Sequence, residues 1–129
     1  MSDTSFLGWP FFTDRHRALA DAIERWSATN LPAAQGDVDA ACRELVQKLG
    51  RDGFLAHTAP DPDAPAPLDV RTLCLMRETL ARHDGLADFA FAMQGLGAGP
   101  ISLFGSAEQR NWLKHTRSGQ AIAAFALTE

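Results

Sequence analysis

Few of the residues that build common catalytic or metal sites occur together in this sequence. It has only two cysteines, Cys42 and Cys74, with neither a CxxC spacing nor a nearby pair of histidines. We expect both to be reduced thiols in a helical core. The chain also contains no HExxH pair and no GxSxG segment, which mark many zinc enzymes and serine hydrolases. No metal site is therefore predicted.

Basic residues and long apolar runs are also scarce. The 12 Lys and Arg residues are outnumbered by 16 Asp and Glu residues and form no cluster, so nucleic-acid binding is not predicted. No stretch approaches the roughly 20 apolar residues that span a bilayer. The opening MSDTSFLGWPFF lacks the basic start and long apolar segment of a signal peptide. We therefore expect no membrane span and a cytoplasmic location.

What the sequence does contain is a series of helix signals. Its 129 residues, 46% of them hydrophobic, suffice for one globular domain. Thr13, Asp37 and Asp69 can cap helices, and Ser106 with Gln109 forms an S-x-x-Q capping box. Helical segments are expected over residues 13–30, 37–50, 69–85, 86–99, 101–105 and 106–116, with a Pro-rich loop over 58–68. These segments predict an all-α fold, an antiparallel bundle of five to six helices.

The apolar pattern also predicts which side of each helix is buried. The segment 86–99 is almost entirely apolar and should lie at the centre of the bundle, with its three glycines loosening its end and Pro100 beginning the next turn. Trp112 and Leu113 should face inward. In the segment 69–85, the predicted inward side consists of Val70, Leu73, Cys74, Arg77 and Leu80.

Neither the histidines nor the glycine-rich stretch points to catalysis. His16, His57, His83 and His115 are scattered, and the last two follow helix ends, where a cation is favourable, so structural roles are expected. The stretch GLGAG superficially resembles a phosphate-binding loop. Because it follows an apolar helix and has no lysine, it indicates a helix break or a close crossing instead.

The C-terminal stretch SGQAIAAFALTE follows a turn-forming Ser-Gly pair and breaks the helical pattern. Its last residues are almost free of charge, which is unusual for a surface segment. Its alanines favour a helix, whereas Ile122, Phe125 and Leu127 favour a strand. Periodicity alone leaves both alternatives open.

The order of these segments resembles the N-terminal region of the flavin-dependent acyl-CoA dehydrogenases. The resemblance lies in the helix RETLAR, the apolar helix that follows it, the Pro-Ile pair, the start GSAEQR, a Gly-containing turn and the ending ALTE. The chain departs from the family at the turn APDPDAPAPL, which differs from the turn that family members commonly have at this place. The resemblance implies a helical domain over residues 1–118 and the first strand of a β-domain over 119–129, in a protein that continues beyond this sequence.

The resemblance also implies positions for substrate and cofactor. The helix from Leu86 to Leu96 would line the acyl pocket, and the strand ending in ALTE would lie against FAD. The substrate positions would be Phe89, Ala92 and Met93, and the flavin positions would be Phe125, Leu127 and Thr128. An apolar helix in a bundle core explains the first set equally well. No catalytic base is expected among these residues.

The implied activity is the α,β-dehydrogenation of an acyl-CoA, in which a base removes the α proton and the β hydride passes to N5 of FAD. The implied partners are the acyl-CoA substrate, an electron-transfer flavoprotein and further copies of the complete enzyme. An acyl-CoA oxidase would share these features, and a stand-alone helical interaction module is an alternative. By itself the chain is expected to be inactive and to bind no FAD, because a few strand contacts fall short of the roughly 8 kcal/mol needed for micromolar affinity.

Overall fold

Helices account for all the regular secondary structure in the part of the chain that the computed structural model describes, residues 3–33 and 36–127. The expected all-α bundle is therefore confirmed. The α-helices are α1 (Asp14–Asn30), α2 (Val38–Arg51), α3 (Val70–His83), α4 (Gly85–Phe104), α5 (Ala107–Arg110) and α6 (Trp112–Arg117), and the 3-10 helices are η1 (Ser5–Gly8) and η2 (Phe54–His57).

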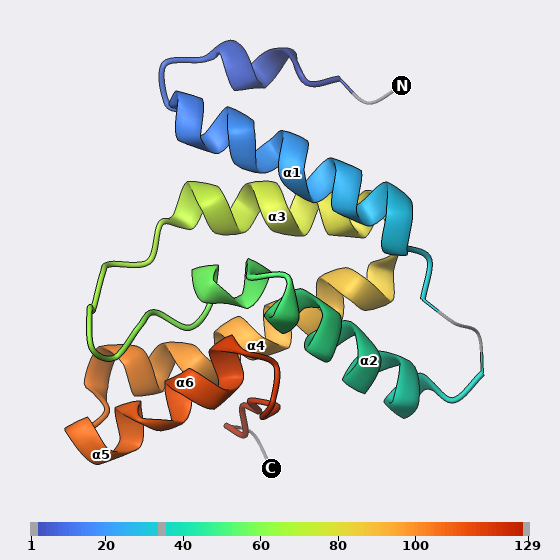
Figure 1. Ribbon diagram of the computed structural model, residues 1–129. Coiled ribbons are helices and arrows are strands. Elements are labelled where there is room, and N and C mark those ends of the chain that lie inside the picture. Colours follow the sequence, from blue (N-terminus) through green and yellow to red (C-terminus); the bar gives the residue numbers. More distant parts are fainter. Residues whose placement is uncertain (1–2, 34–35, 128–129) are drawn as a thin grey trace.

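Consecutive long helices reverse direction, and α3 lies between α1 and α4 (Figure 1). Helix α2 packs on α4, while the short helices α5 and α6 pack against the end of α4. One continuous apolar core holds the four long helices and η2 together. Its most buried large side chains are Ile23, Leu45, Leu49, Leu55, Met76, Leu80 and Phe91.

The predicted caps at Asp37, Asp69 and Ser106 are confirmed. The carboxylates of Asp37 and Asp69 accept hydrogen bonds from backbone N–H groups in the first turns of α2 and α3. Ser106 and Gln109 form the expected reciprocal capping box at the start of α5. Each bond satisfies an N–H group that a helix end leaves without a partner. The stretch from Thr58 to Asp69 is a loop, as expected.

The predicted inward side of α3 is right for Leu80, which is buried, and for Leu73, which packs partly buried against the core, but it is wrong for the other three residues. Val70, Cys74 and Arg77 are exposed. The buried residues of α3 are Thr72, Leu75, Met76, Thr79 and Leu80. Because α3 contacts α1 on one side and α4 on another, two neighbours set its buried surface, and two threonines belong to it. The expectation of two core thiols is wrong as well, because Cys42 is only half-buried.

Helix α4 is longer than predicted, because it runs without a break through Gly95, Gly97, Gly99 and Pro100 to Phe104. Proline removes one helical hydrogen bond. Contacts with α2, α3, α5 and α6 nevertheless hold both halves of the helix in place. Of the two residues of α6 predicted to face inward, Leu113 is buried, which confirms the prediction. Trp112 is 62% exposed, so the prediction is wrong for this residue.

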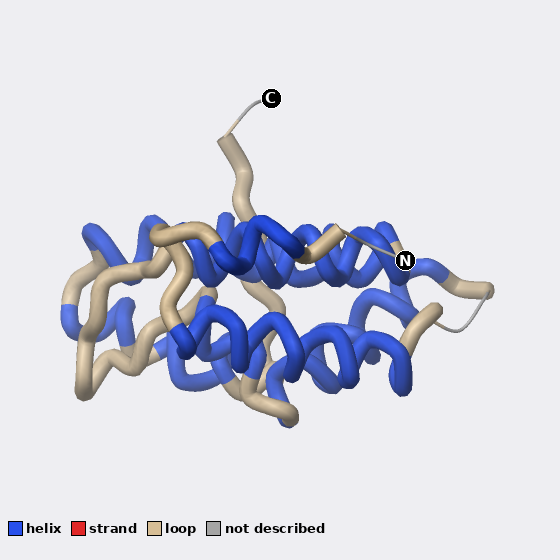
Figure 2. Tube along the Cα trace, turned by 90° about the horizontal axis from the view of Figure 1, so that it is seen from above, coloured by secondary structure: helices blue, strands red, loops and turns tan. Residues whose placement is uncertain are grey.

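The C-terminal segment, which we define as residues 119–127, leaves the bundle after α6. It forms neither helix nor strand from Ala121 to Leu127, so these residues adopt neither of the two expected conformations. The segment first crosses the bundle and then projects away from the helices (Figure 2). The predicted flavin position Thr128 lies outside the described residues.

A search of the described residues finds no helix with the length and apolarity needed to cross a membrane.

Candidate functional site

Two of the three predicted substrate positions lie together, beside the C-terminal segment. Phe89 and Met93, one turn apart on α4, line a cavity of about 300 Å³ between α2, α4 and this segment. The remaining lining residues are Asp39, Cys42, Arg43, Val46, Ala90, Gln94, Ile122 and Ala123. The cavity therefore joins α4 to the stretch that leads to the predicted flavin positions.

The third predicted substrate position, Ala92, is not part of this cavity. It lines a neighbouring cavity of about 290 Å³ together with Leu73 and Arg77 of α3. The structure thus separates the predicted set, because Ala92 points from α4 toward α3 while Phe89 and Met93 lie on the side of α2. Helical geometry explains the separation, since Ala92 is turned by about 60° around the helix axis from Phe89 and by about 100° from Met93.

The cavity beside the C-terminal segment, which we call the α4 cavity, offers no activated nucleophile. Burial, assisted by the neighbouring Asp39 carboxylate, raises the pKa of the Cys42 thiol. The thiol therefore stays protonated at neutral pH. The charged residues of the lining, Asp39 and Arg43, are both exposed. The α4 cavity can hold an apolar group, and its lining includes one carboxylate, that of the exposed Asp39.

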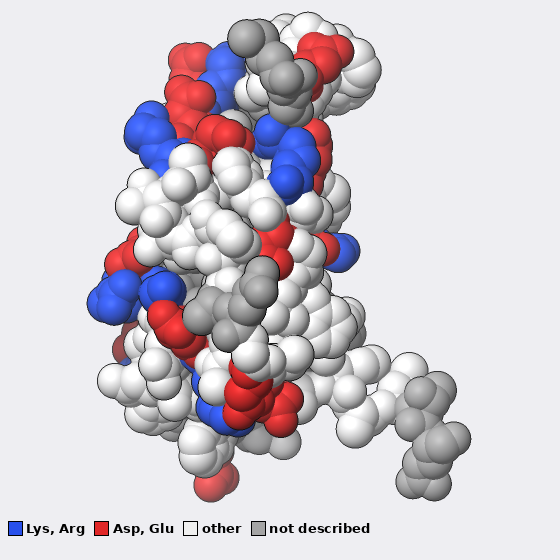
Figure 3. All heavy atoms as spheres, turned by 90° about the vertical axis from the view of Figure 1, so that its right-hand side faces the viewer, with Lys and Arg blue, Asp and Glu red and all other residues white. Residues whose placement is uncertain are grey.

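A row of exposed apolar residues follows α4 from end to end. Phe89, Leu96 and Leu103 are 58%, 51% and 60% exposed, and Met93 and Pro100 lie between them in the same row. Their spacings of four, three, four and three residues place them on one side of the helix. In the view of Figure 3 the surface leading to the projecting C-terminal segment is mostly uncharged. Soluble domains rarely expose such a continuous apolar surface without a binding role.

The predicted flavin positions in the described part of the chain are exposed. Phe125 is 43% exposed and Leu127 is 78% exposed. Neither backbone N–H group of these residues has a hydrogen-bond partner within residues 3–33 and 36–127. Both the side chains and the backbone are therefore free to contact another molecule.

Sequence reasoning missed the residues that hold the C-terminal segment on the bundle. The side-chain oxygen of Gln94 in α4 accepts a hydrogen bond of 2.8 Å from the backbone N–H of Ala123. Gly97 and Gly50 lie directly beneath the segment and leave room for its backbone. A signal was present for Gln94, because it is the only polar side chain between Asp88 and Gly99 in an otherwise apolar helix.

Sequence reasoning also missed a polar cluster that joins the starts of α1 and α3. His16 is 1% exposed, and its Nδ1 accepts the backbone N–H of Thr13. The ring proton therefore lies on Nε2, which donates to Asp69 at 2.8 Å. Burial acts to raise the pKa of Asp69, but hydrogen bonds from His16 and Arg71 outweigh it and hold the pKa well below its usual range. The cluster fixes two helices and leaves no free reactive group.

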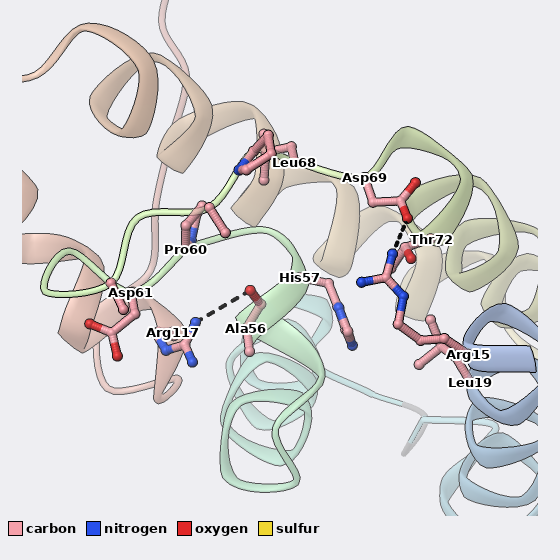
Figure 4. A pocket seen from close by; sticks show the side chains of 13 residues that line it. Arg15, Leu19, Ala56, His57, Pro60, Asp61, Leu68, Asp69, Thr72 and Arg117 are labelled. Atoms are coloured by element: carbon pink, nitrogen blue, oxygen red, sulfur yellow. Dashed lines mark hydrogen bonds and ion pairs between the residues drawn. The ribbon is translucent and has the colours of Figure 1, made fainter. Parts of the chain in front are cut away.

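A third, more polar cavity of about 410 Å³ lies between α1, η2, the Pro-rich loop and Arg117 of α6 (Figure 4). Burial, followed by the charges of Arg15 and Arg117, lowers the pKa of His57, which faces this cavity. Both guanidinium groups are already engaged: Arg15 binds Asp69, and Arg117 donates to the backbone oxygens of η2 and the residues after it. None of the predicted site residues lies here.

The described residues contain no group of three or more His, Cys, Asp or Glu side chains that could hold a metal ion.

Comparison with known families identifies a match along most of the chain. Residues 13–120 match the sequence model described as the acyl-CoA dehydrogenase N-terminal domain. A probable acyl-CoA dehydrogenase of Bacillus subtilis is 32% identical over 92% of this chain and 21% of its own length. A 3-(aryl)acrylate reductase of Clostridium sporogenes is 27% identical over 92% of this chain and 33% of its own length.

A mitochondrial short-chain specific acyl-CoA dehydrogenase of Bos taurus is 29% identical over 90% of this chain. The match covers 29% of that relative. The chain therefore spans a third or less of the length of these three relatives.

Proposed function

This chain belongs to the acyl-CoA dehydrogenase family through its N-terminal domain, and we propose that it forms one wall of the site at which such an enzyme oxidises an acyl-CoA at its α and β carbons. One observation carries the proposal. The α4 cavity brings Phe89 and Met93 together with Ile122 and Ala123, just before the predicted flavin positions. The acyl-binding helix and the flavin-binding segment would then be adjacent, as the reaction requires.

The acyl chain would lie along the exposed row of α4. Phe89, Met93 and Leu96 offer apolar surface, and each buried methylene of the chain would contribute about 0.8 kcal/mol. Ala92 would contact the chain from the side of α3, where it lines the neighbouring cavity. The role of these residues is to bind and orient the thioester and to exclude water from it.

The residues of the C-terminal segment fit a flat, partly apolar cofactor such as FAD. Phe125 and Leu127 are exposed, and their backbone N–H groups have no partner within the described ranges. They could cover the ring system and donate hydrogen bonds to its edge, and Thr128 would add a hydroxyl group. When bound, FAD would supply the hydride acceptor. The chain's own residues hold and shield the cofactor, and none of them serves as the base.

The remaining parts of the site would come from protein outside these 129 residues. We place the boundary of the helical domain at residues 118 and 119, where Gly119 begins the C-terminal segment. The catalytic base and the surfaces for association between copies would lie beyond this boundary. The electron acceptor would be a separate partner. An electron-transfer flavoprotein is the proposed acceptor, and an oxidase that uses oxygen would need the same wall.

Photolabelling of the 129-residue chain tests this proposal. An acyl-CoA carrying a diazirine at the end of its chain is irradiated with the protein, and the tryptic peptides are analysed by mass spectrometry. The label is expected in residues 83–110, which contain α4, and in residues 118–129. An excess of unlabelled acyl-CoA should remove it.

Two variants provide the matched control. Phe89→Ala should reduce the labelling severalfold, because Phe89 lines the α4 cavity. Phe104→Ala should leave it unchanged, because Phe104 is 86% exposed and lies outside that cavity. Labelling that centres on the peptides of α1 or α3, or that responds equally to both variants, contradicts the proposal.

A further inference from the structure

The side chain of Gln94 is buried at the point where the C-terminal segment crosses α4. Only 2% of Gln94 is exposed. Its oxygen accepts the backbone N–H of Ala123 at 2.8 Å, and its amide nitrogen donates to the backbone oxygen of Ala90 at 3.4 Å. A buried amide is costly unless its polar atoms are bonded. Both ends of the Gln94 amide have a partner, and one of the partners belongs to the C-terminal segment.

The surface around Gln94 is shaped to receive the segment at close range. A Cβ atom built on Gly97, one turn further along α4, would lie 2.7 Å from both the Cβ of Ala123 and the backbone nitrogen of Ala124. A Cβ atom on Gly99 would meet nothing within 4 Å. Glycine is therefore needed at 97, where the segment passes, and the space is open at 99.

A second close approach holds the beginning of the segment. A Cβ atom on Gly50 of α2 would lie 2.3 Å from the backbone nitrogen of Gly119. Gly119 itself has a φ of +74°, a conformation that favours glycine. Two glycine contacts and one buried hydrogen bond thus fix the segment from residue 119 to residue 124.

These contacts connect the two halves of the proposed site. Gln94 directly follows Met93, which lines the α4 cavity. On the segment, Ala123 precedes the predicted flavin position Phe125 by two residues, a chain distance of at most about 7 Å. A shift of the segment along α4 would therefore move the flavin positions past the acyl-binding row.

We propose that Gln94 is a positioning residue that sets the flavin-contacting segment in register with the acyl-binding side of α4, and that Gly97 provides the room for this contact. The functional part of this inference rests on the proposed function. The positioning itself can be measured without FAD or acyl-CoA, so its failure would be distinguishable from failure of the proposed function.

Amide hydrogen exchange of the 129-residue chain, followed residue by residue by NMR, tests the hydrogen bond. Gln94→Met keeps the length of the side chain and removes the acceptor. The amide of Ala123 should then exchange at least about fivefold faster, which corresponds to the loss of one hydrogen bond. Gln94→Glu keeps an acceptor oxygen but loses the donor to Ala90, so it should restore only part of the protection. Gln47→Met, on the exposed side of α2, controls for the loss of an amide.

Gly97→Ala and Gly99→Ala test whether the segment needs the room left by Gly97. Both variants change the helix propensity of α4 equally, but only the Cβ atom at position 97 would meet the C-terminal segment. Gly97→Ala should accelerate exchange in the C-terminal segment severalfold, and Gly99→Ala should not. Core amides such as those of Leu45 and Leu80 should keep their protection in every variant. The proposal is overturned if Gln94→Met leaves the segment unchanged while Gly97→Ala and Gly99→Ala behave alike. It is also overturned if core and segment lose protection by the same factor in both Gln94→Met and Gly97→Ala.

Discussion

The α1–α3 side of the bundle and the α4 side expose very different surfaces. Between α1 and α3, side chains pair with one another: His16 binds Asp69, and Glu24 binds both Arg82 and His83. Along α4 and the C-terminal segment, large apolar side chains are exposed and lack such partners. The first surface is held together by these pairs. The second has the properties of a binding surface, and we therefore assign stability mainly to one side and function to the other.

Phe91 and Phe89 offer the strongest test of this contrast, because they lie two residues apart on α4. Phe91 is 1% exposed within the core, and Phe89 is 58% exposed beside the α4 cavity. Phe91→Ala should lower the free energy of unfolding by about 3–5 kcal/mol. Phe89→Ala should change it by less than about 0.5 kcal/mol. Urea unfolding followed by circular dichroism measures both. Equal losses would contradict the division between the two sides.

Asp69 tests whether the α1–α3 side depends on its polar cluster. Asp69→Ala removes the cap of α3, which contributes about 1 kcal/mol, and leaves the buried Nε2–H of His16 unpaired, at a cost of roughly 1–3 kcal/mol. Asp63→Ala should have almost no effect, because Asp63 is 74% exposed and pairs only with Lys114. Thermal unfolding compares the two. A loss for Asp69→Ala no larger than that for Asp63→Ala would contradict the assignment.

The pH dependence of stability tests the same cluster. Because the pKa of Asp69 is lower in the folded chain than its ordinary value of 3.8, its ionised form stabilises the fold above that value. This contribution should disappear as the pH falls from about 4 through the lower folded pKa. Asp69→Ala should therefore show a smaller loss of stability on acidification than the wild-type chain. Parallel stability curves for the two proteins would show that Asp69 makes no such contribution.

The sequence predicted the helix caps well, but it predicted poorly which residues of each helix are buried against other parts of the chain. The caps at Asp37, Asp69 and Ser106 are local interactions, so a few neighbouring residues were enough to identify them. The buried side of α3 depends on helices distant in sequence. The same is true of Gly97, whose neighbour Ala123 is 26 positions away. Its apparent role as a helix breaker was wrong because that contact explains the glycine.

The substrate positions remain predictions, and the structure shows only where they lie. A family resemblance pointed to Phe89 and Met93, and the structure places both beside the C-terminal segment. The same resemblance grouped Ala92 with them, but helix rotation directs Ala92 into another cavity. Gln94 stood out as a polar residue in an apolar stretch, but its partner is a backbone N–H group, which a pattern of side-chain types does not identify.

The smallest effect on stability is expected at the end of α4. Leu103→Ser combined with Phe104→Ser replaces two side chains that are 60% and 86% exposed. The free energy of unfolding should change by less than about 0.5 kcal/mol. Self-association at high concentration, measured by sedimentation velocity, should decrease because exposed apolar surface is reduced. An unchanged sedimentation profile together with lower stability would indicate that these residues belong to the packed core.

The central claim is that the α4 side, and not the α1–α3 side, receives the acyl group. An NMR titration of the 129-residue chain with acyl-CoA thioesters of increasing chain length, compared with free CoA, tests it most directly. We predict chemical-shift changes at Phe89, Met93, Ile122 and Ala123 that grow with chain length and are absent with free CoA. Changes that are strongest around His16 and Asp69, or that are the same with and without the acyl group, would contradict the claim.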